Sequence, residues 1–235
     1  MINFIDSRIK KSIIKGKGNG FIATKDIPAN STILIETPSF IIENYTQSAF
    51  DIFEILFVIL NSNDNESKKL FFEFYPHTYD NQFDNLATKI KSQLKKLKKY
   101  NSNIYNYLTS HNDNNEIVLL SLKYICNAFN FFDMGPGILL TGSTFNHSCF
   151  PNTIFGKSID GKMNFITIRD IKKNDELCIN YIDISKSNKL RINHLLNQYG
   201  FTCNCERCSN QNKSSNLFEQ IKIIKKKVNL KFNNI

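Results

Sequence analysis

The stretch Cys203-Asn204-Cys205-Glu206-Arg207-Cys208 places three cysteines within six residues. Cysteines this close cannot form good disulfides with one another, because neighbouring Cα atoms direct the thiols badly. They can instead bring three thiolates to one soft metal ion, which leaves a tetrahedral site one ligand short. The best candidate for the fourth ligand is Cys149, about fifty residues earlier. The alternative, scattered buried thiols, accounts poorly for this density, so the run indicates a Zn2+ site.

Three further segments stand out upstream of this run. They are Phe145-Asn146-His147-Ser148-Cys149-Phe150-Pro151-Asn152, Asp175-Glu176-Leu177-Cys178-Ile179-Asn180-Tyr181, and Lys17-Gly18-Asn19-Gly20 with the residues that follow it to Ile27. The first resembles the NHSCxPN signature of SET-domain protein lysine methyltransferases, and the second resembles that family's E-L-x-I-x-Y signature. The third resembles its opening G-x-G strand and turn, and the cysteine run resembles its post-SET zinc motif. All four occur in the family's order, from about residue 12 to residue 208.

The resemblance implies an α+β fold: a SET fold of small β-sheets with a helical insert and a zinc-binding post-SET segment. In this family the Asn146 segment passes beneath the loop that carries Tyr181, a knot-like exception to the rule that chains do not thread loops. The expected divisions are a SET domain at 10–183, with its insert at about 46–124, a post-SET zinc segment at 184–210, and an amphipathic helix at 211–235.

Hydrophobic periodicity supports these divisions. Residues 12–42 alternate β-prone runs with turns, and a strand is expected at residues 32–35. Apolar residues then recur at helical spacing to about residue 124, with polar loops expected at 61–67 and 111–116. The β character returns from residue 137 to residue 181, most clearly at 165–168.

Two segments favour the SET–MYND branch of the family: Tyr124-Ile125-Cys126-Asn127-Ala128-Phe129, and Gln198-Tyr199-Gly200-Phe201. No cysteine and histidine cluster follows Phe40, so we expect no MYND zinc finger. The sequence ends at Ile235, and that branch's large C-terminal helical domain is not expected either. Those parts serve partner and substrate binding, so the resemblance does not specify the substrate.

The implied activity is S-adenosylmethionine-dependent protein lysine N-methyltransfer. Such a reaction depends mainly on alignment of two bound reactants. An apolar aromatic channel assists it, because desolvation lowers the pKa of the target lysine. The resemblance assigns cofactor binding to Lys17, Gly18, Asn19, Gly20, Asn127, Asn146, His147, Tyr181 and Phe201. Zinc is assigned to Cys149, Cys203, Cys205 and Cys208, whereas Cys126 and Cys178 are expected to be small buried side chains.

Tyr181 is the expected catalytic residue, because of its register in the second signature. A phenol with a pKa near 10 is a poor general base at neutral pH. We therefore expect Tyr181 to orient the reactants and to provide electrostatic support, with the lysine proton lost to water. Phe129 and Tyr199 are expected to line the substrate channel, and Phe201 to pack on the adenine.

The formal net charge of +9 could suggest a nucleic-acid partner. The excess lies largely in two lysine-rich stretches, 89–99 and 222–227, and the chain is rich in Asn, Ile and Lys, which AT-rich codons encode. This bias hints at a protist or a large virus, so nucleic-acid binding is not favoured. The expected partner is a protein carrying a target lysine, a histone or another protein, and the expected state is a monomer.

No secretory signal and no apolar run long enough to cross a bilayer is visible in the sequence, so no membrane association is expected. We expect a reducing location, cytoplasmic or nuclear, and a host cell if the gene is viral.

Two alternatives to the enzymatic function stay open. One is a catalytically silent SET protein that acts as a peptide-binding or scaffold module, and the other is a nucleic-acid-binding zinc protein. The presence of Tyr181, Asn146 and His147 favours the enzyme.

Overall fold

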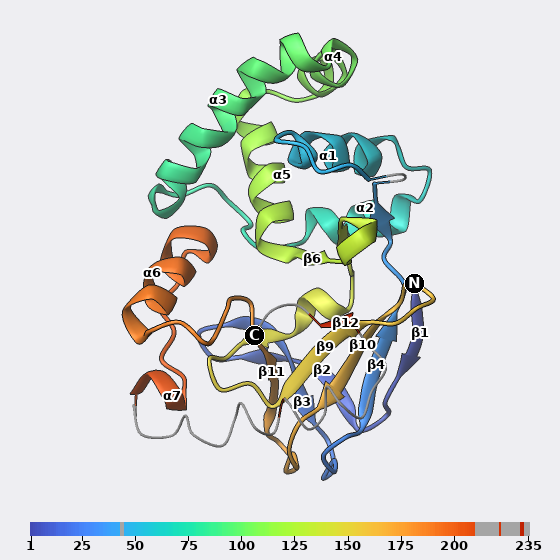
Figure 1. Ribbon diagram of the computed structural model, residues 1–235, viewed down its shortest axis with the longest axis vertical. Coiled ribbons are helices and arrows are strands. Elements are labelled where there is room, and N and C mark those ends of the chain that lie inside the picture. Colours follow the sequence, from blue (N-terminus) through green and yellow to red (C-terminus); the bar gives the residue numbers. More distant parts are fainter. Residues whose placement is uncertain (43–44, 210–220, 222–230, 233–235) are drawn as a thin grey trace. The chain divides into compact units, whose positions relative to one another are not determined.

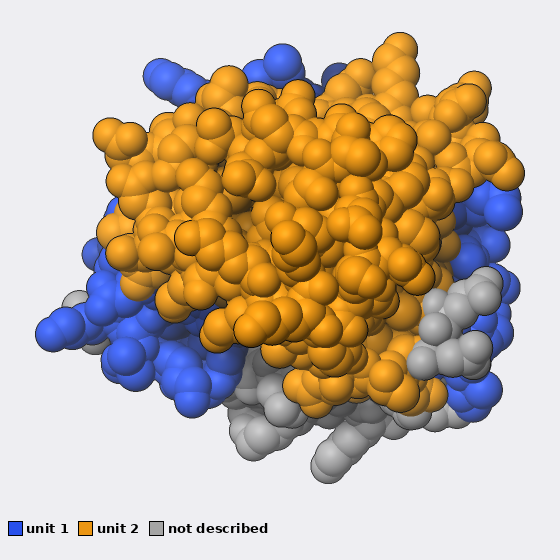
Figure 2. Space-filling model, turned by 90° about the horizontal axis from the view of Figure 1, so that it is seen from above, with its two compact units in different colours: residues 1–37, 141–195, 202–235 blue, residues 38–140, 196–201 orange. Residues whose placement is uncertain are grey.

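The computed structural model describes residues 1–42, 45–209, 221 and 231–232 (Figure 1). The chain divides into two compact units, coloured separately in Figure 2. Unit 1 consists of Met1–Thr37, Thr141–Leu195 and Thr202–Ile235, and unit 2 of Pro38–Leu140 and Leu196–Phe201. The β portions at both ends of the sequence therefore join in unit 1, whereas unit 2 holds the helical insert.

Unit 1 contains a five-stranded sheet with the strand order β1-β4-β10-β9-β12. The strands are β1 (Ile2–Ile5), β4 (Thr32–Glu36), β10 (Met163–Thr167), β9 (Thr153–Lys157) and β12 (Lys231–Phe232), and all neighbours are antiparallel. The predicted strand at 32–35 thus forms with one further residue, and the predicted strand at 165–168 begins two residues earlier and ends one residue earlier. Leu34 and Phe165, which face each other in register, are fully buried, so the middle of this sheet is part of the core.

The second sheet of unit 1 has the order β2-β3-β11-β8. Its strands are β2 (Ile9–Ile14), β3 (Gly18–Ala23), β11 (Glu176–Ile179) and β8 (Asn146–His147). Strand β8 pairs with β11 in parallel, with Cys178 opposite Asn146 and Ile179 opposite His147. This pairing places the first two signature segments side by side. The β2–β3 turn uses Gly16 and Gly18, both at φ 75°, a conformation that side chains with a Cβ rarely adopt.

Unit 2 combines helices with a small sheet of order β5-β7-β6. The strands are β5 (Phe40–Ile41), β7 (Pro136–Ile138) and β6 (Ala128–Asn130). The helices are α1 (Asp51–Asn61), α2 (Asn65–Phe72), α3 (Asp84–Tyr100), α4 (Ser102–His111) and α5 (Asn114–Asn127), with 3-10 turns η1 (Asn81–Phe83) and η2 (Phe132–Met134). Residues at helical spacing form the core; in α3, Ile90, Leu94 and Leu97 are buried.

The two polar stretches expected as loops are partly helical, and that expectation was wrong in extent. Helix α2 begins inside the 61–67 stretch, because the Asp64 side chain accepts a hydrogen bond from the Ser67 amide. Helix α5 begins inside the 111–116 stretch with a complete capping box between Asp113 and Glu116. In both cases the polar residues satisfy the free amides of a helix N-terminus.

The cysteine run is preceded by α6 (Asn188–Tyr199), and α7 (Glu206–Ser209) covers its end; the turn η3 (Gly142–Thr144) precedes β8. Neither helix was predicted. The expected C-terminal helix falls on residues 211–235, of which only 221 and 231–232 belong to the described part of the chain. None of the helices that the structure describes combines the length and hydropathy needed to cross a membrane. The predicted α+β class is confirmed.

Candidate metal centre and catalytic site

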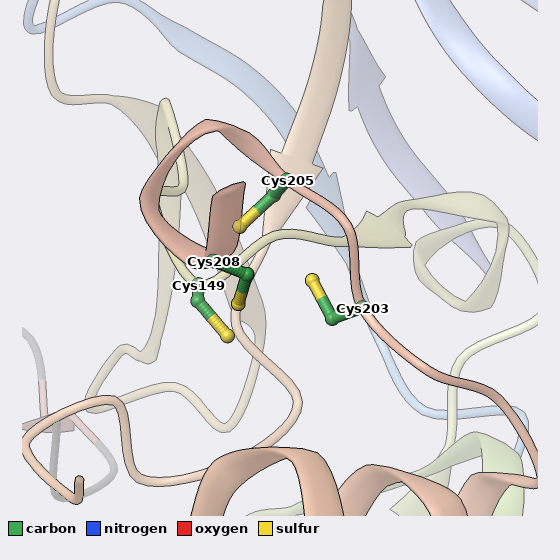
Figure 3. A group of neighbouring side chains, drawn as sticks. All are labelled: Cys149, Cys203, Cys205 and Cys208. Atoms are coloured by element: carbon green, nitrogen blue, oxygen red, sulfur yellow. The ribbon is translucent and has the colours of Figure 1, made fainter. Parts of the chain in front are cut away.

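Four cysteines of unit 1 form a compact cluster: Cys149 after β8, Cys203 and Cys205 before α7, and Cys208 within it. Their sulfur atoms lie within 4.8 Å of one another and turn toward one shared point (Figure 3). Four thiol donors in such an arrangement suit a tetrahedral Zn2+ site. The structure therefore brings together the four cysteines that the sequence singled out as ligands.

The remaining two cysteines lie outside this cluster. Burial raises the pKa of Cys126 to about 12 and that of Cys178 to about 12, so both are protonated at neutral pH. Within the cluster the opposite holds for Cys205. Its pKa lies far below the usual range because the Cys149 and Cys203 thiols donate hydrogen bonds to its sulfur. The same hydrogen bonds raise the pKa of Cys149, and the pKa of Cys203 is also raised, so Cys205 is the preferred thiolate of these three, and thiolate is the form that binds metal.

Two buried arginines lie next to the cluster. Arg191 points a guanidinium nitrogen at the Cys208 sulfur from 3.9 Å, and Arg207 donates to the Cys149 carbonyl at 3.3 Å. The Nε of Arg191 has no hydrogen-bond partner. Positive groups held in the interior, one of them with an unused donor, fit a centre that carries net negative charge, as a metal with four thiolates does.

The Tyr181 side chain is fixed through its hydroxyl. It donates a hydrogen bond of 2.6 Å to the carbonyl of Phe145. The Phe145 ring is fully buried and stacks on Phe165 at 4.8 Å, with Phe21 4.7 Å away on a tilted plane. Because the phenol proton points at a carbonyl held by this aromatic core, the hydroxyl oxygen has a defined position and presents its lone pairs away from Phe145.

His147 connects this tyrosine to the cysteine cluster. Its Nδ1 accepts a hydrogen bond of 3.0 Å from the Tyr181 amide, and its Nε2 lies 3.2 Å from the Cys149 sulfur. Burial lowers the pKa of His147 to about 3, so the ring is neutral. Since Nδ1 is the acceptor, the proton of the neutral ring resides on Nε2 and faces the sulfur.

Asn146 and Glu176 form the centre of a second network. The Asn146 amide nitrogen donates to the Asn19 carbonyl at 3.1 Å and to Glu176 Oε1 at 2.9 Å, while Lys17 Nζ lies 2.6 Å from Glu176 Oε2. Burial disfavours the ammonium of Lys17, but the Glu176 hydrogen bond and the nearby negative groups together outweigh burial and raise the pKa of Lys17. Glu176 was not among the predicted site residues, although its place in the second signature could have indicated it.

The two glycines of the turn segment differ in their surroundings. A Cβ on Gly20 would lie 2.6 Å from the Asn146 amide nitrogen and 2.6 Å from Ile14, so the close approach of these groups requires glycine. A Cβ on Gly18 would meet no atom within 4 Å. The backbone at Gly18 therefore borders open space, which leaves room for a ligand to approach it.

The other predicted residues lie in unit 2. Asn127, at the end of α5, donates its side-chain amide to the carbonyls of Tyr75 and Lys123, each at 2.7 Å. Phe129 on β6 is buried. The rings of Tyr199 and Phe201 lie 6.4 Å apart, and burial raises the pKa of Tyr199. The structure thus brings Tyr199 and Phe201 together.

Comparison with known proteins gives concordant results. A family model for the SET domain matches residues 18–182. A SET domain-containing protein of Acanthamoeba polyphaga mimivirus, L678, is 44% identical over 209 residues, which cover 88% of this chain and 80% of that protein. The human histone-lysine N-methyltransferase SMYD3 is 34% identical over 101 residues, or 40% of this chain and 23% of SMYD3.

Among solved structures, Rubisco LSMT bound to AdoMet matches with a TM-score of 0.63 at 17% identity. The SET domain of LSMT bound to lysine and AdoHcy matches with a TM-score of 0.61, also at 17% identity, over 88% of this chain and 55% of that one. At this identity the likeness concerns the fold. The chain spans about half the length of these solved structures and less than a quarter of SMYD3.

Proposed function

Since the chain belongs to the SET-domain family, we propose that it is an S-adenosylmethionine-dependent protein lysine N-methyltransferase. The observation that carries this proposal is the hydroxyl of Tyr181, held on the Phe145 carbonyl at 2.6 Å beside the paired segments of β8 and β11. The ligands of the solved relatives, AdoMet in one and lysine with AdoHcy in another, support the same pair of reactants.

The cofactor, when bound, supplies a methyl group on a positively charged sulfur. Lys17, Gly18, Asn19 and Gly20 are proposed to hold it through backbone groups, since the chain at Gly18 borders open space. Asn146 and His147 are proposed as further contacts. The Asn146 amide nitrogen and both His147 ring nitrogens already bind Asn19, Glu176, Tyr181 and Cys149, so backbone atoms and the Asn146 side-chain oxygen are proposed as the contacts to a ligand.

Tyr181 is proposed to orient the target lysine and to stabilise developing positive charge with its oxygen lone pairs. The hydroxyl donates its hydrogen bond to the Phe145 carbonyl, so toward other groups its oxygen can only accept. A phenol is too weak a base to remove the lysine proton at neutral pH, and that proton passes to water. The roles of Asn127 and Phe201 at the cofactor, and of Phe129 and Tyr199 in the lysine channel, stay predictions from the resemblance.

Zinc is proposed to bind Cys149, Cys203, Cys205 and Cys208, which the donor set and the adjacent arginines support. Because Cys149 lies two residues after His147, the metal would fasten the β8 segment to the chain that follows α6. A thiolate site of this kind requires reduced cysteines, so we infer an intracellular location, in an infected host cell if the gene, like that of L678, is viral.

The proposal is tested by incubating the purified protein with isotopically labelled S-adenosylmethionine and a protein mixture. Core histones are the first choice, because SMYD3 is a histone-lysine methyltransferase, and a whole-cell lysate is the second. Label in a protein band that depends on Tyr181 supports the enzyme. Cofactor binding without transfer to any protein would instead identify a silent SET module, and salt-sensitive DNA binding in a gel shift would favour the nucleic-acid alternative.

A further inference from the structure

Arg191 is held in the interior, and no carboxylate in the described part of the chain is its partner. Its side chain projects from α6, and the residue is 4% exposed. The guanidinium donates to the Lys186 carbonyl at 2.7 Å and to the Asn188 amide oxygen at 3.1 Å. Among the described residues no carboxylate forms an ion pair with it, and its Nε has no partner. A buried charge of this kind is costly unless an opposite charge lies close by.

The opposite charge available to Arg191 is the cysteine cluster. The Nη2 atom lies 3.9 Å from the Cys208 sulfur. Cys208 is one of four cysteines whose sulfur atoms lie within 4.8 Å of one another, so several sulfur atoms that carry negative charge as thiolates lie beside the guanidinium.

A second arginine lies on the same cluster. Arg207 is 8% exposed and donates to the carbonyls of Cys149 and Ile184, at 3.3 and 2.7 Å. Arg191 and Arg207 thus both contact cysteines of the cluster from the interior. Two buried positive charges beside one site are costly unless an anion at that site compensates both.

A zinc ion bound by four thiolates provides this anion, because the complex carries two net negative charges. We propose that Arg191 is the charge-compensating residue of the metal centre, which retains the metal by neutralising the thiolates, with Arg207 as the second positive group. This inference rests on the proposed zinc site. Partners outside the ligand shell commonly alter metal affinity by tenfold to a hundredfold.

The test compares variants that separate charge from hydrogen bonding. R191Q keeps amide donors but removes the charge, whereas R191K keeps the charge without the planar guanidinium. R191M, a second neutral variant, keeps much of the side-chain volume if R191Q does not fold. K189Q is the matched control, because Lys189 is exposed on the same helix two positions earlier and carries the same charge.

The readout is metal binding, measured without substrate or S-adenosylmethionine. Co2+ is titrated in competition with a chelator and followed by the ligand-field absorption of a tetrahedral thiolate site, and Zn2+ release to a chromophoric chelator gives the rate of loss. We expect R191Q and R191M to bind Co2+ at least about tenfold more weakly and to lose Zn2+ faster. We expect R191K and K189Q to stay within about threefold of the wild-type protein.

Three outcomes would overturn the role of Arg191. R191Q and R191M could bind metal like the wild type, R191K could be as weak as R191Q, or K189Q could lose as much affinity as R191Q. Wild-type protein that binds neither Co2+ nor Zn2+ would overturn the metal site itself. Loss of methyl transfer plays no part in this assay, so failure of the proposed enzymatic function is recognised separately.

Discussion

The backbone amide of Tyr181 donates a 3.0 Å hydrogen bond to Nδ1 of His147. The same ring faces the Cys149 sulfur at 3.2 Å through its other nitrogen. One neutral imidazole therefore joins the proposed catalytic tyrosine to a proposed metal ligand. The position of the Tyr181 backbone depends on a ring whose orientation the metal centre would fix.

His147→Ala should weaken both zinc retention and S-adenosylmethionine binding, because it removes the donor to Cys149 and the acceptor for Tyr181 together. We expect an effect of about tenfold on each. Chelator competition and calorimetric titration measure the two separately. The control is His77→Ala, an exposed histidine of unit 2. A variant that keeps both affinities would show that the imidazole is dispensable for each.

Tyr181→Phe should keep cofactor affinity and lower methyl transfer at saturating cofactor by at least tenfold, or about 1.4 kcal/mol of barrier. The substitution retains the ring and removes the hydroxyl that Phe145 holds. Tyr45→Phe is a suitable control, since it removes the hydroxyl that donates to Asp51 in unit 2. Unchanged turnover in Tyr181→Phe would contradict the proposed role of the Tyr181 hydroxyl.

Asn146→Ala should weaken S-adenosylmethionine binding, because it leaves the Asn19 carbonyl and Glu176 Oε1 without their shared donor. The turn that carries Asn19 is then less well fixed. Calorimetric titration gives the affinity. Asn164→Ala removes a comparable amide that donates to Ser158 and Lys162, also in unit 1, and should leave the affinity unchanged. Equal affinities in the two variants would contradict the role of Asn146.

Gly20→Ala should destabilise unit 1 by about 1 to 3 kcal/mol, since the new methyl group would overlap the Asn146 amide and Ile14. It should also weaken cofactor binding, because Asn146 must move. Denaturant unfolding and calorimetry measure the two effects. In Gly16→Ala the new Cβ would meet open space. The expected loss of stability is about 1 to 2 kcal/mol, because residue 16 has a φ of 75° that alanine rarely adopts. It should therefore keep its cofactor affinity, and a matching loss there would rule out the steric explanation.

Cys205→Ser, or removal of zinc by a chelator, should abolish cofactor binding and methyl transfer while most of the secondary structure persists. The strands that form the sheets of unit 1 contain none of the four cluster cysteines, so we expect the metal to contribute its folding free energy locally. Metal analysis should find one zinc per chain. Cys126→Ser, outside the cluster, should retain it. A chelated protein that still methylates at full rate would contradict this dependence.

The fold class and the set of four clustered cysteines could be predicted from the sequence, because both depend on motifs with fixed spacing. Helix α6 could not be predicted from hydrophobic periodicity. Only Arg191 and Leu195 are buried in it, so its sequence shows no apolar stripe. The expected loops also include the capping residues Asp64 and Asp113, although their side chains begin helices. Polar residues are ambiguous until their hydrogen-bond partners are known.

The side-chain contacts of the site could not be predicted in the same way. The resemblance indicated Asn146 and His147 as cofactor contacts. Their hydrogen bonds to Glu176 and Tyr181 follow from the parallel register of β8 and β11, which no local pattern encodes. Likewise, the position of Arg191 beside Cys208 depends on how α6 packs. Such contacts follow from tertiary structure.

The separation of Cys149 from Cys203, Cys205 and Cys208 matters during synthesis on the ribosome. At 5 to 20 residues per second, the residues between Cys149 and Cys203 take roughly 3 to 11 seconds to translate. During that interval Cys149 is a thiol without its partners, open to oxidants and to exchange with other thiols. A nascent chain can complete its metal centre only once Cys208 has left the exit tunnel, so zinc uptake would come after the strands on both sides of Cys149 have been made.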